Sequence, residues 1–215
     1  MRKLLATALL ASPLLAAAAP ANLVFNGSFE SGLTGWTTTA TAGTLYPAQV
    51  ITYGPGAAFG EAVAADNSTS LSPDVAGERA MYFVDDNATL TLSQTFTVAT
   101  AGLYSVGFST YAPANGLANR GNASFSAKLD ATSLLATGVN ALPATTWQAQ
   151  SGLVNLSAGS HTLSFSFVTN AVPSNDLVLD RAYVISAPVP EPETYALMLA
   201  GLAALGFIAR RRRAR

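Results

Sequence analysis

The chain has 215 residues, with 11 basic and 12 acidic residues, one histidine and no cysteine. Seven of the basic residues lie at the two ends, so the stretch 22–187 keeps four basic against ten acidic residues, a net charge of −6. This charge argues against nucleic-acid binding, which needs a basic surface. The absence of cysteine excludes disulfides, and a single histidine gives little support to a zinc site or a histidine-based catalytic triad.

The first 21 residues have the pattern of a secretory signal peptide. Arg2 and Lys3 form a short basic region, and residues 4–19 are apolar and rich in Leu and Ala. Ala19-Pro20-Ala21 then offers a small-residue cleavage site in front of Asn22. This arrangement predicts that residues 1–21 are removed and that the remainder is exported.

The stretch 22–187 alternates apolar and polar residues, which is typical of β-strands that are covered on one face. The clearest run is 90–98, and 104–108, 125–129 and 163–167 repeat its pattern. Further strands are predicted at several places: 23–25, 49–53, 80–84, 134–136, 147–156 and 177–185. Turn residues separate these runs, and no stretch has a helical period. We therefore predict one all-β domain, an antiparallel, jelly-roll-like β-sandwich.

Both ends of this stretch carry a family resemblance. Residues 22–36, Asn-Leu-Val-Phe-Asn-Gly-Ser-Phe-Glu-Ser-Gly-Leu-Thr-Gly-Trp, resemble the opening of galactose-binding-like jelly rolls, including the CenC-type carbohydrate-binding modules. Residues 176–185, Asp-Leu-Val-Leu-Asp-Arg-Ala-Tyr-Val-Ile, are similar to the last strand of those modules. That strand usually carries two adjacent acids, whereas Arg181 follows Asp180 here, so the second half of the pattern is missing.

The resemblance implies a structural calcium ion held by Glu30 and Asp180, since the modules use calcium to join an early acid to a late one. Asp180 has the strand parity of three apolar residues: Val178, Ala182 and Val184. It is therefore expected to point inward, and a buried carboxylate must be paired or bound to a cation. The alternatives are an ion pair of one acid with Arg79 or Arg181, or simple exposure at a turn.

Aromatic residues outside the regular strand cores are candidates for stacking on a sugar ring. They are Trp36, Tyr46, Tyr53, Phe59, Tyr111 and Trp147. We select Trp36 and Tyr111 as ligand-binding candidates, Tyr111 because it precedes a Pro-Ala-Asn-Gly segment expected to form an exposed loop. The alternative for Trp36 and Trp147 is that they fill the core of the sandwich.

No catalytic residues are predicted. Asp85 and Asp86 follow an apolar strand, where paired acids bind a cation or act as acid and base, but an exposed hairpin turn is the simpler interpretation. The chain contains no nucleophile elbow, phosphate loop or dinucleotide fingerprint. His161 begins a strand and is expected at the surface or an edge. A hydrolase with two carboxylates stays a distant alternative.

The last 28 residues combine three features in order. Val189, Pro190, Glu191 and Pro192 form a Pro/Glu-rich turn, Tyr195 to Ala209 is an uncharged run, and residues 210–215 are rich in arginine. As a helix the 15 residues of this run cover about 22 Å, less than the roughly 30 Å of a bilayer core, and snorkelling arginines shorten the difference. We predict a short transmembrane helix at about 194–209, with Arg210, Arg211, Arg212 and Arg213 on the cytoplasmic side.

This tail, 188–215, resembles the PEP-CTERM sorting signal of Gram-negative bacteria, with Pro190-Glu191-Pro192 as the namesake triplet. The same tail is also described as an ice-binding-protein C-terminal domain. The resemblance implies an exosortase-type enzyme as partner, transient attachment to the inner membrane, and then a place at the cell surface or in a biofilm matrix. The alternative is a plain anchor that is never cut.

The sequence thus leaves three functions open for residues 22–187. The first is a non-enzymatic component of the cell surface or exopolysaccharide matrix. The second is a glycan-binding module that attaches the cell to polysaccharide, and the third is the small hydrolase.

Overall fold

The computed structural model describes residues 20–57, 59–119, 121–170, 173–187 and 192–213. The predicted signal peptide up to residue 19, and Val189, Pro190 and Glu191 of the sorting turn, lie outside the described residues.

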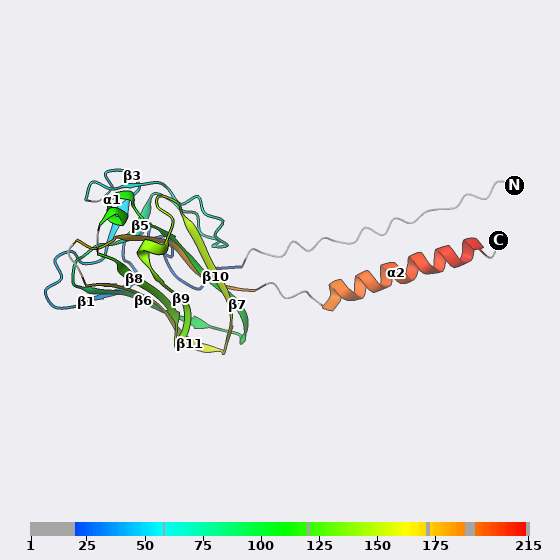
Figure 1. Cartoon of the computed structure of the whole chain (residues 1–215). Coiled ribbons are helices and arrows are strands. Elements are labelled where there is room, and N and C mark those ends of the chain that lie inside the picture. Colours follow the sequence, from blue (N-terminus) through cyan, green and yellow to red (C-terminus); the bar gives the residue numbers. More distant parts are fainter. Residues whose placement is uncertain (1–19, 58, 120, 171–172, 188–191, 214–215) are drawn as a thin grey trace.

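The described strands form two five-stranded antiparallel sheets and one small hairpin (Figure 1). One sheet has the order β1 (Thr37–Ala40), β6 (Thr89–Val98), β11 (Gly159–Thr169), β8 (Ala123–Leu129) and β9 (Thr132–Gly138). The other has the order β10 (Gln148–Leu156), β7 (Gly102–Tyr111), β12 (Leu177–Ser186), β5 (Arg79–Phe83) and β2 (Gln49–Thr52). The hairpin pairs β3 (Gly54–Pro55) with β4 (Ala62–Val63). The predicted antiparallel β-sandwich is confirmed.

The main core lies between the two sheets. Many of its side chains come from positions that alternate along the strands: Leu90, Leu92 and Phe96 of β6, Phe108 of β7, Phe125 of β8, and Phe165 and Phe167 of β11. The intervening Thr and Ser residues of β6 and β11 are half-buried or exposed. Period-two alternation therefore produced the sandwich as expected, because successive side chains of a strand point to opposite faces.

The predicted strand at 23–25 does not form. Residues 23–28 make bends and turns, and Asn26 and Phe29 have positive φ angles of 53° and 58°. The Leu23 N–H still donates to the Val184 carbonyl at 2.9 Å, so the segment lies beside β12 without becoming a strand of its sheet.

Residues 53–57 and 59–78, called the cover segment below, lie over the outer face of the sheet that contains β12. Its carbonyls accept hydrogen bonds from side chains of that sheet: Tyr111 Oη to Ala62 at 3.2 Å and Trp147 Nε1, just before β10, to Ala64 at 2.8 Å. A second small core forms beneath the segment from Ile51, Val63, Ala80, Tyr82, Tyr111, Trp147 and Val178. The central strands β7, β12 and β5 of this sheet are thus buried on both faces, whereas the edge strand β10 stays largely open.

A β-bulge in β12 decides where Asp180 points. The register to β7 shifts between Asp180 and Tyr183, and Arg181 has a φ of 50°. Val178 lies in the second core, whereas Ala182 and Val184 lie in the main core. The expectation that Asp180 shares a face with Ala182 and Val184 is therefore wrong, because the bulge reverses the alternation. Asp180 is fully buried, as expected, but on the side of the cover segment.

Three helical elements complete the described fold: α1 (Ala114–Ala118), the 3-10 turn η1 (Val139–Ala141) and α2 (Pro192–Arg213). Helix α2 starts at a proline, whose fixed φ suits the first turn of a helix, and Figure 1 shows it apart from the sandwich. None of the helices described here is both long and apolar enough to cross a membrane, so the transmembrane helix predicted at 194–209 is not confirmed.

Candidate glycan-binding site

Loops from five parts of the chain meet in one hollow of about 240 Å³, called the apical pocket below. They contribute Tyr46, Phe59, Glu61, Val84, Asp85, Asp86, Asn115, Asn119, Pro173, Ser174 and Asp176. These residues precede β2 or β12, follow β5, or lie in the β3–β4 turn and around α1. The sheets hold the loop ends in place, which is how rigid scaffolds commonly present binding residues.

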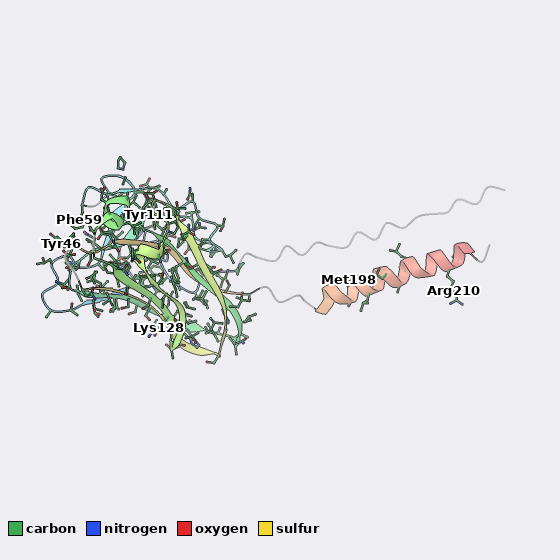
Figure 2. All side chains as sticks on the ribbon, viewed as in Figure 1. Tyr46, Phe59, Tyr111, Lys128, Met198 and Arg210 are labelled. Carbon is green, nitrogen blue, oxygen red and sulfur yellow. The ribbon has the colours of Figure 1, made fainter. Side chains whose placement is uncertain are left out.

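Two aromatic side chains of the apical pocket are open to solvent. Tyr46 is 44% exposed and Phe59 is 53% exposed. Their ring centroids lie 4.9 Å apart at an angle of 76°, and Phe59 also stacks on the buried ring of Tyr82 at 6.0 Å. Figure 2 shows both labelled residues at the same end of the sandwich. Exposed rings of this kind suit the apolar face of a sugar.

Phe59 is held in a strained backbone conformation. Its φ angle is 50°, in the left-handed region that bulky residues rarely adopt. Such a conformation costs about 1–3 kcal/mol and persists where the surroundings enforce it, often at functional sites. Phe29 has a similar φ of 58° but is fully buried in the main core, so it is the exposure of Phe59 that makes this ring a candidate for contact with a ligand.

A buried carboxylate orders the loop that carries Tyr46. Asp85 Oδ2 accepts the backbone N–H groups of Leu45 at 2.9 Å and Tyr46 at 3.0 Å. Asp86 Oδ1 accepts the Ser174 N–H at 2.7 Å and so joins the loop after β5 to the loop before β12. The expected exposed hairpin turn at 85–86 is wrong, because Asp85 is only 3% exposed and both acids line the pocket.

Two further carboxylates are almost fully buried in the pocket wall. Glu61 is 3% exposed and accepts the Asn115 N–H at 3.3 Å, and Asp176 is 6% exposed and accepts the Tyr82 hydroxyl at 2.8 Å. Burial raises the pKa of Asp176 to about 6; the Tyr82 hydrogen bond opposes this rise, and the negative charges of Glu61 and Asp86 add to it. A Cβ on Gly116 would lie 2.7 Å from the Asp176 side chain, so α1 approaches this acid through a glycine.

Amide side chains fix the α1 side of the pocket. The buried Asn175 donates from Nδ2 to the carbonyls of Gly116, Leu117 and Asn119 at 3.0–3.2 Å. Asn119 Nδ2 donates to the Ser174 carbonyl at 2.6 Å. The exposed Asn115 has no side-chain hydrogen bond among the described residues and lines the hollow, so its amide is open to a ligand.

The two aromatic residues selected from the sequence lie elsewhere. Trp36 is 8% exposed, donates from Nε1 to the Asn26 carbonyl at 3.0 Å and packs in the main core, as the alternative interpretation expected. Tyr111 is 3% exposed and packs 5.2 Å from Trp147. The expected exposed position of Tyr111 is wrong, because the cover segment lies over it. Trp36 is enclosed in the core, and Tyr111 borders a separate hollow of about 310 Å³ lined mainly by apolar residues of the cover segment, with only 3% of the tyrosine exposed.

The acids selected as calcium ligands have other contacts. Glu30 Oε1 accepts the N–H groups of Glu78 at 2.9 Å and Arg79 at 2.8 Å. Asp180 accepts the Tyr53 hydroxyl on Oδ2 and its neighbour's N–H, that of Arg181, on Oδ1. Burial raises the pKa of Asp180 to about 8, partly offset by these hydrogen bonds. Within the described ranges no three acidic or histidine side chains form a group suited to a metal ion. Both carboxylates thus fit protein donors, and the calcium hypothesis stays untested.

The predicted ion pairing of Arg181 is present in a different form. Its guanidinium lies 4.0 Å from Asp66 and donates to the carbonyls of Ser70 and Ser72 at 3.4 Å. Arg181 therefore holds the cover segment rather than Glu30. His161 was expected at the surface or an edge, but it is only 8% exposed and lies in β11, an inner strand of its sheet. Its Nδ1 lies 2.7 Å from Asp130 Oδ2, and this hydrogen bond raises the pKa of the imidazole.

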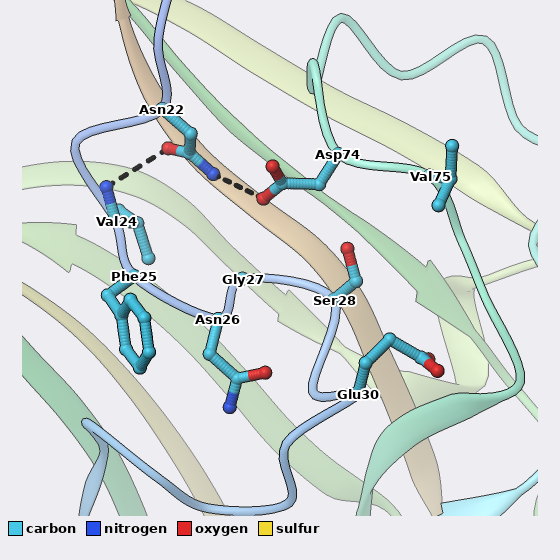
Figure 3. A pocket seen from close by; sticks show the side chains of 9 residues that line it. All are labelled: Asn22, Val24, Phe25, Asn26, Gly27, Ser28, Glu30, Asp74 and Val75. Carbon is cyan, nitrogen blue, oxygen red and sulfur yellow. Dashed lines mark hydrogen bonds between the residues drawn. The ribbon is translucent and has the colours of Figure 1, made fainter.

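Glu30 borders a second hollow, of about 410 Å³, shown in Figure 3. Asn22 spans it, with Nδ2 donating to Asp74 at 2.7 Å and Oδ1 accepting the Val24 N–H at 3.0 Å. Asn26 donates to the carbonyls of Gly32 and Thr34 at 2.9 and 3.1 Å. The amides of Asn22 and Asn26 therefore fix the first segment of the sandwich by hydrogen bonds. Among the residues that line this hollow, Phe25 is the only aromatic one. The apical pocket, with two open rings, is therefore the stronger candidate for a glycan site.

Comparison with known proteins adds two findings. A family model described as the PEP-CTERM protein-sorting motif matches residues 188–213. No curated protein matches the chain. The sorting motif implies an exported protein.

Solved structures share the fold. The structure of TmCBM61 in complex with β-1,4-galactotriose is 18% identical, with a TM-score of 0.54 over 78% of this chain and 99% of that one. The K3 adhesin domain of Lys-gingipain from Porphyromonas gingivalis is 15% identical, with a TM-score of 0.50 over 78% and 99% of the two chains. The chain therefore carries a PEP-CTERM sorting motif behind a β-sandwich with the fold of carbohydrate-binding modules.

Proposed function

We propose that this protein is a non-enzymatic component of the bacterial cell surface or extracellular matrix, and that its sandwich binds polysaccharide in the apical pocket. The observation that carries the second part is the pair of open rings, Tyr46 and Phe59, beside carboxylates and the exposed amide of Asn115. Apolar faces with a few polar groups are what a sugar ring requires. The galactotriose bound to TmCBM61 supports a glycan as the class of ligand.

The sorting motif supports the first part. The matched region contains the Pro190-Glu191-Pro192 triplet, the apolar run and the arginines. An exosortase-type enzyme would recognise this tail at the inner membrane and process it near the turn, after which the sandwich is released to the surface. Removal of residues 1–21 by signal peptidase would complete the mature chain.

Intact mass and cell fraction in the native host test the sorting. The expected species lacks both residues 1–21 and the arginine-rich end, and it is recovered with extracellular polysaccharide. A protein that keeps Arg215 and stays with the inner membrane would contradict processing and leave a periplasmic protein that is not cut.

Glycan binding is tested on an array of bacterial and plant polysaccharides with the native protein, Phe59→Ala and Phe25→Ala. Phe25 is a matched control because it is 60% exposed and lines the other hollow. We expect Phe59→Ala alone to lose binding. If no glycan binds the native protein, the sandwich acts as a structural matrix component without a carbohydrate ligand.

A small glycan hydrolase is the second candidate function. It is favoured by Asp176, whose pKa of about 6 suits a general acid, beside Glu61. Release of reducing ends from a bound polysaccharide, abolished by Asp176→Asn, would establish it. We expect no such release.

A further inference from the structure

The apical pocket has an excess of negative charge. Four carboxylates line it, from Glu61, Asp85, Asp86 and Asp176, and no described lining residue is Lys, Arg or His. The described basic residues of the sandwich lie elsewhere. Arg79 is the first residue of β5, at the end of the strand away from Asp85. Lys128 borders a separate hollow and lies apart from Tyr46 and Phe59 in Figure 2. Arg181 faces Asp66. Arg120 lies outside the described residues.

Two of these carboxylates are incompletely satisfied. Glu61 Oε2 accepts one long hydrogen bond, from the Asn115 N–H at 3.3 Å, and Asp176 Oδ2 accepts the Tyr82 hydroxyl. Their other oxygens have no hydrogen-bond or ion-pair partner among the described residues; these atoms keep contact with solvent, although both residues are more than nine-tenths buried. Buried carboxylates are normally paired with a cation or fully hydrogen-bonded. The pocket wall is thus prepared for a positive charge.

The surroundings favour an organic cation over a metal ion. The described residues contain no cluster of three acidic or histidine side chains suited to a metal. The carboxylates instead lie beside two exposed rings, and aromatic faces attract ammonium groups. A hollow of about 240 Å³ is smaller than drug-sized pockets of roughly 300–1,000 Å³, so it suits one sugar unit rather than a longer segment.

We propose that the apical pocket selects a glycan with free amino groups, such as de-N-acetylated hexosamine, with the ammonium group at Glu61 and Asp176 and the sugar ring against Phe59 and Tyr46. An ammonium group supplies three donors, enough for both unpartnered oxygens. Hydrogen bonds between charged groups are stronger than those between neutral ones. This inference rests on the proposed glycan binding and adds the class of sugar to it.

Calorimetry on the full-chain protein tests it with β-1,4-linked glucosamine oligomers, the matching N-acetylated oligomers and β-1,4-galactotriose. At about pH 6.5, below the ordinary pKa of about 8 for a comparable amine, the glucosamine oligomer carries positive charge. We expect it to bind about tenfold more tightly than the acetylated one, with a preference that decreases at high salt.

Charge-removing variants locate the preference. Glu61→Gln should reduce binding of the glucosamine oligomer to the level of the acetylated one, and Asp86→Asn at the pocket rim tests the same point if the buried substitution unfolds the protein. Glu78→Gln is the matched control, since Glu78 is exposed and outside the pocket. It should bind like the native protein.

The outcomes distinguish a failure of the charge selection from a failure of glycan binding itself. Equal or tighter binding of the acetylated oligomer or galactotriose, lost in Phe59→Ala, would keep the glycan site and overturn the charge selection. A glucosamine preference that survives both Glu61→Gln and Asp86→Asn would also overturn it. If none of the sugars bind, and the array likewise shows no ligand, the proposed glycan binding itself fails.

Discussion

The strongest prediction concerns Phe59→Ala and the affinity for polysaccharide. Phe59 is 53% exposed, so about 100 Å² of a side chain of roughly 200 Å² is open to a ligand. A sugar lying on the ring would cover about half of this area and bury a similar area of its own, roughly 100 Å² in total, worth up to about 2.5 kcal/mol at ~25 cal/mol per Å². Because part of the sugar face is polar, we expect a loss of about 1–2.5 kcal/mol, or about 5- to 70-fold in Kd.

The assay is titration of the best array ligand into native, Phe59→Ala and Phe25→Ala proteins. The melting temperature of each variant is measured in parallel, because Phe59 also packs on Tyr82 at 6.0 Å and its removal has a small cost in stability. Unchanged affinity in a folded Phe59→Ala protein, or an equal loss in Phe25→Ala, would refute the assignment of the site to the apical pocket.

Three further predictions concern stability and sorting. Since the pKa of Asp180 is about 8 in the folded protein, against about 3.9 when unfolded, the folded state binds this proton more tightly. The stability that this proton contributes is present below about pH 4 and is lost as pH rises toward 8. Denaturant titrations should therefore show a free energy of unfolding that decreases over this pH range, and a smaller decrease in Asp180→Asn. The same pH dependence in the native protein and the variant would contradict this assignment. Gly27→Ala should destabilise the fold by about 1–3 kcal/mol or more, because its Cβ would lie 2.0 Å from the Ala182 carbonyl oxygen, whereas Gly152→Ala, with open space around it, should have little effect. Replacing residues 190–192 with alanine should keep the arginine-rich end on the protein, as measured by intact mass; continued loss of that end would place the recognition elsewhere in the tail.

Without disulfides, the sandwich depends on its two cores. Aromatic rings fill the main one, with Phe108 and Phe165 at 5.1 Å and Phe83 and Phe167 at 5.7 Å. The cover segment adds the second core and buries the outer face of a sheet that would otherwise be open. Both cores hold the strand ends that carry the apical loops, so the pocket is preformed before any ligand binds.

The sequence by itself determined the strands, the sandwich class and the sorting motif. Alternation along one strand is a local property, so runs such as 90–98 and 163–167 indicate by themselves which of their side chains are buried. The tail is equally local, since its turn, apolar run and arginines are consecutive. One of the two interpretations placed Trp36 and Trp147 in the core of the sandwich; Trp36 does pack there, whereas Trp147 packs in the second core beneath the cover segment.

Only the tertiary structure decided the site. The pocket residues are up to 130 positions apart in the sequence, from Tyr46 to Asp176. Their loops meet because different strands end at the same edge of the sandwich. No repeating pattern in the sequence predicts such a meeting. The burial of Tyr111 depends on the cover segment, which comes from a distant part of the chain. Asp180 lies on the opposite face of β12 from Ala182 and Val184, because one bulge residue reverses the direction of every later side chain in the strand. Local patterns fix which faces are apolar, whereas convergence of loops and placement of bulges depend on long-range packing.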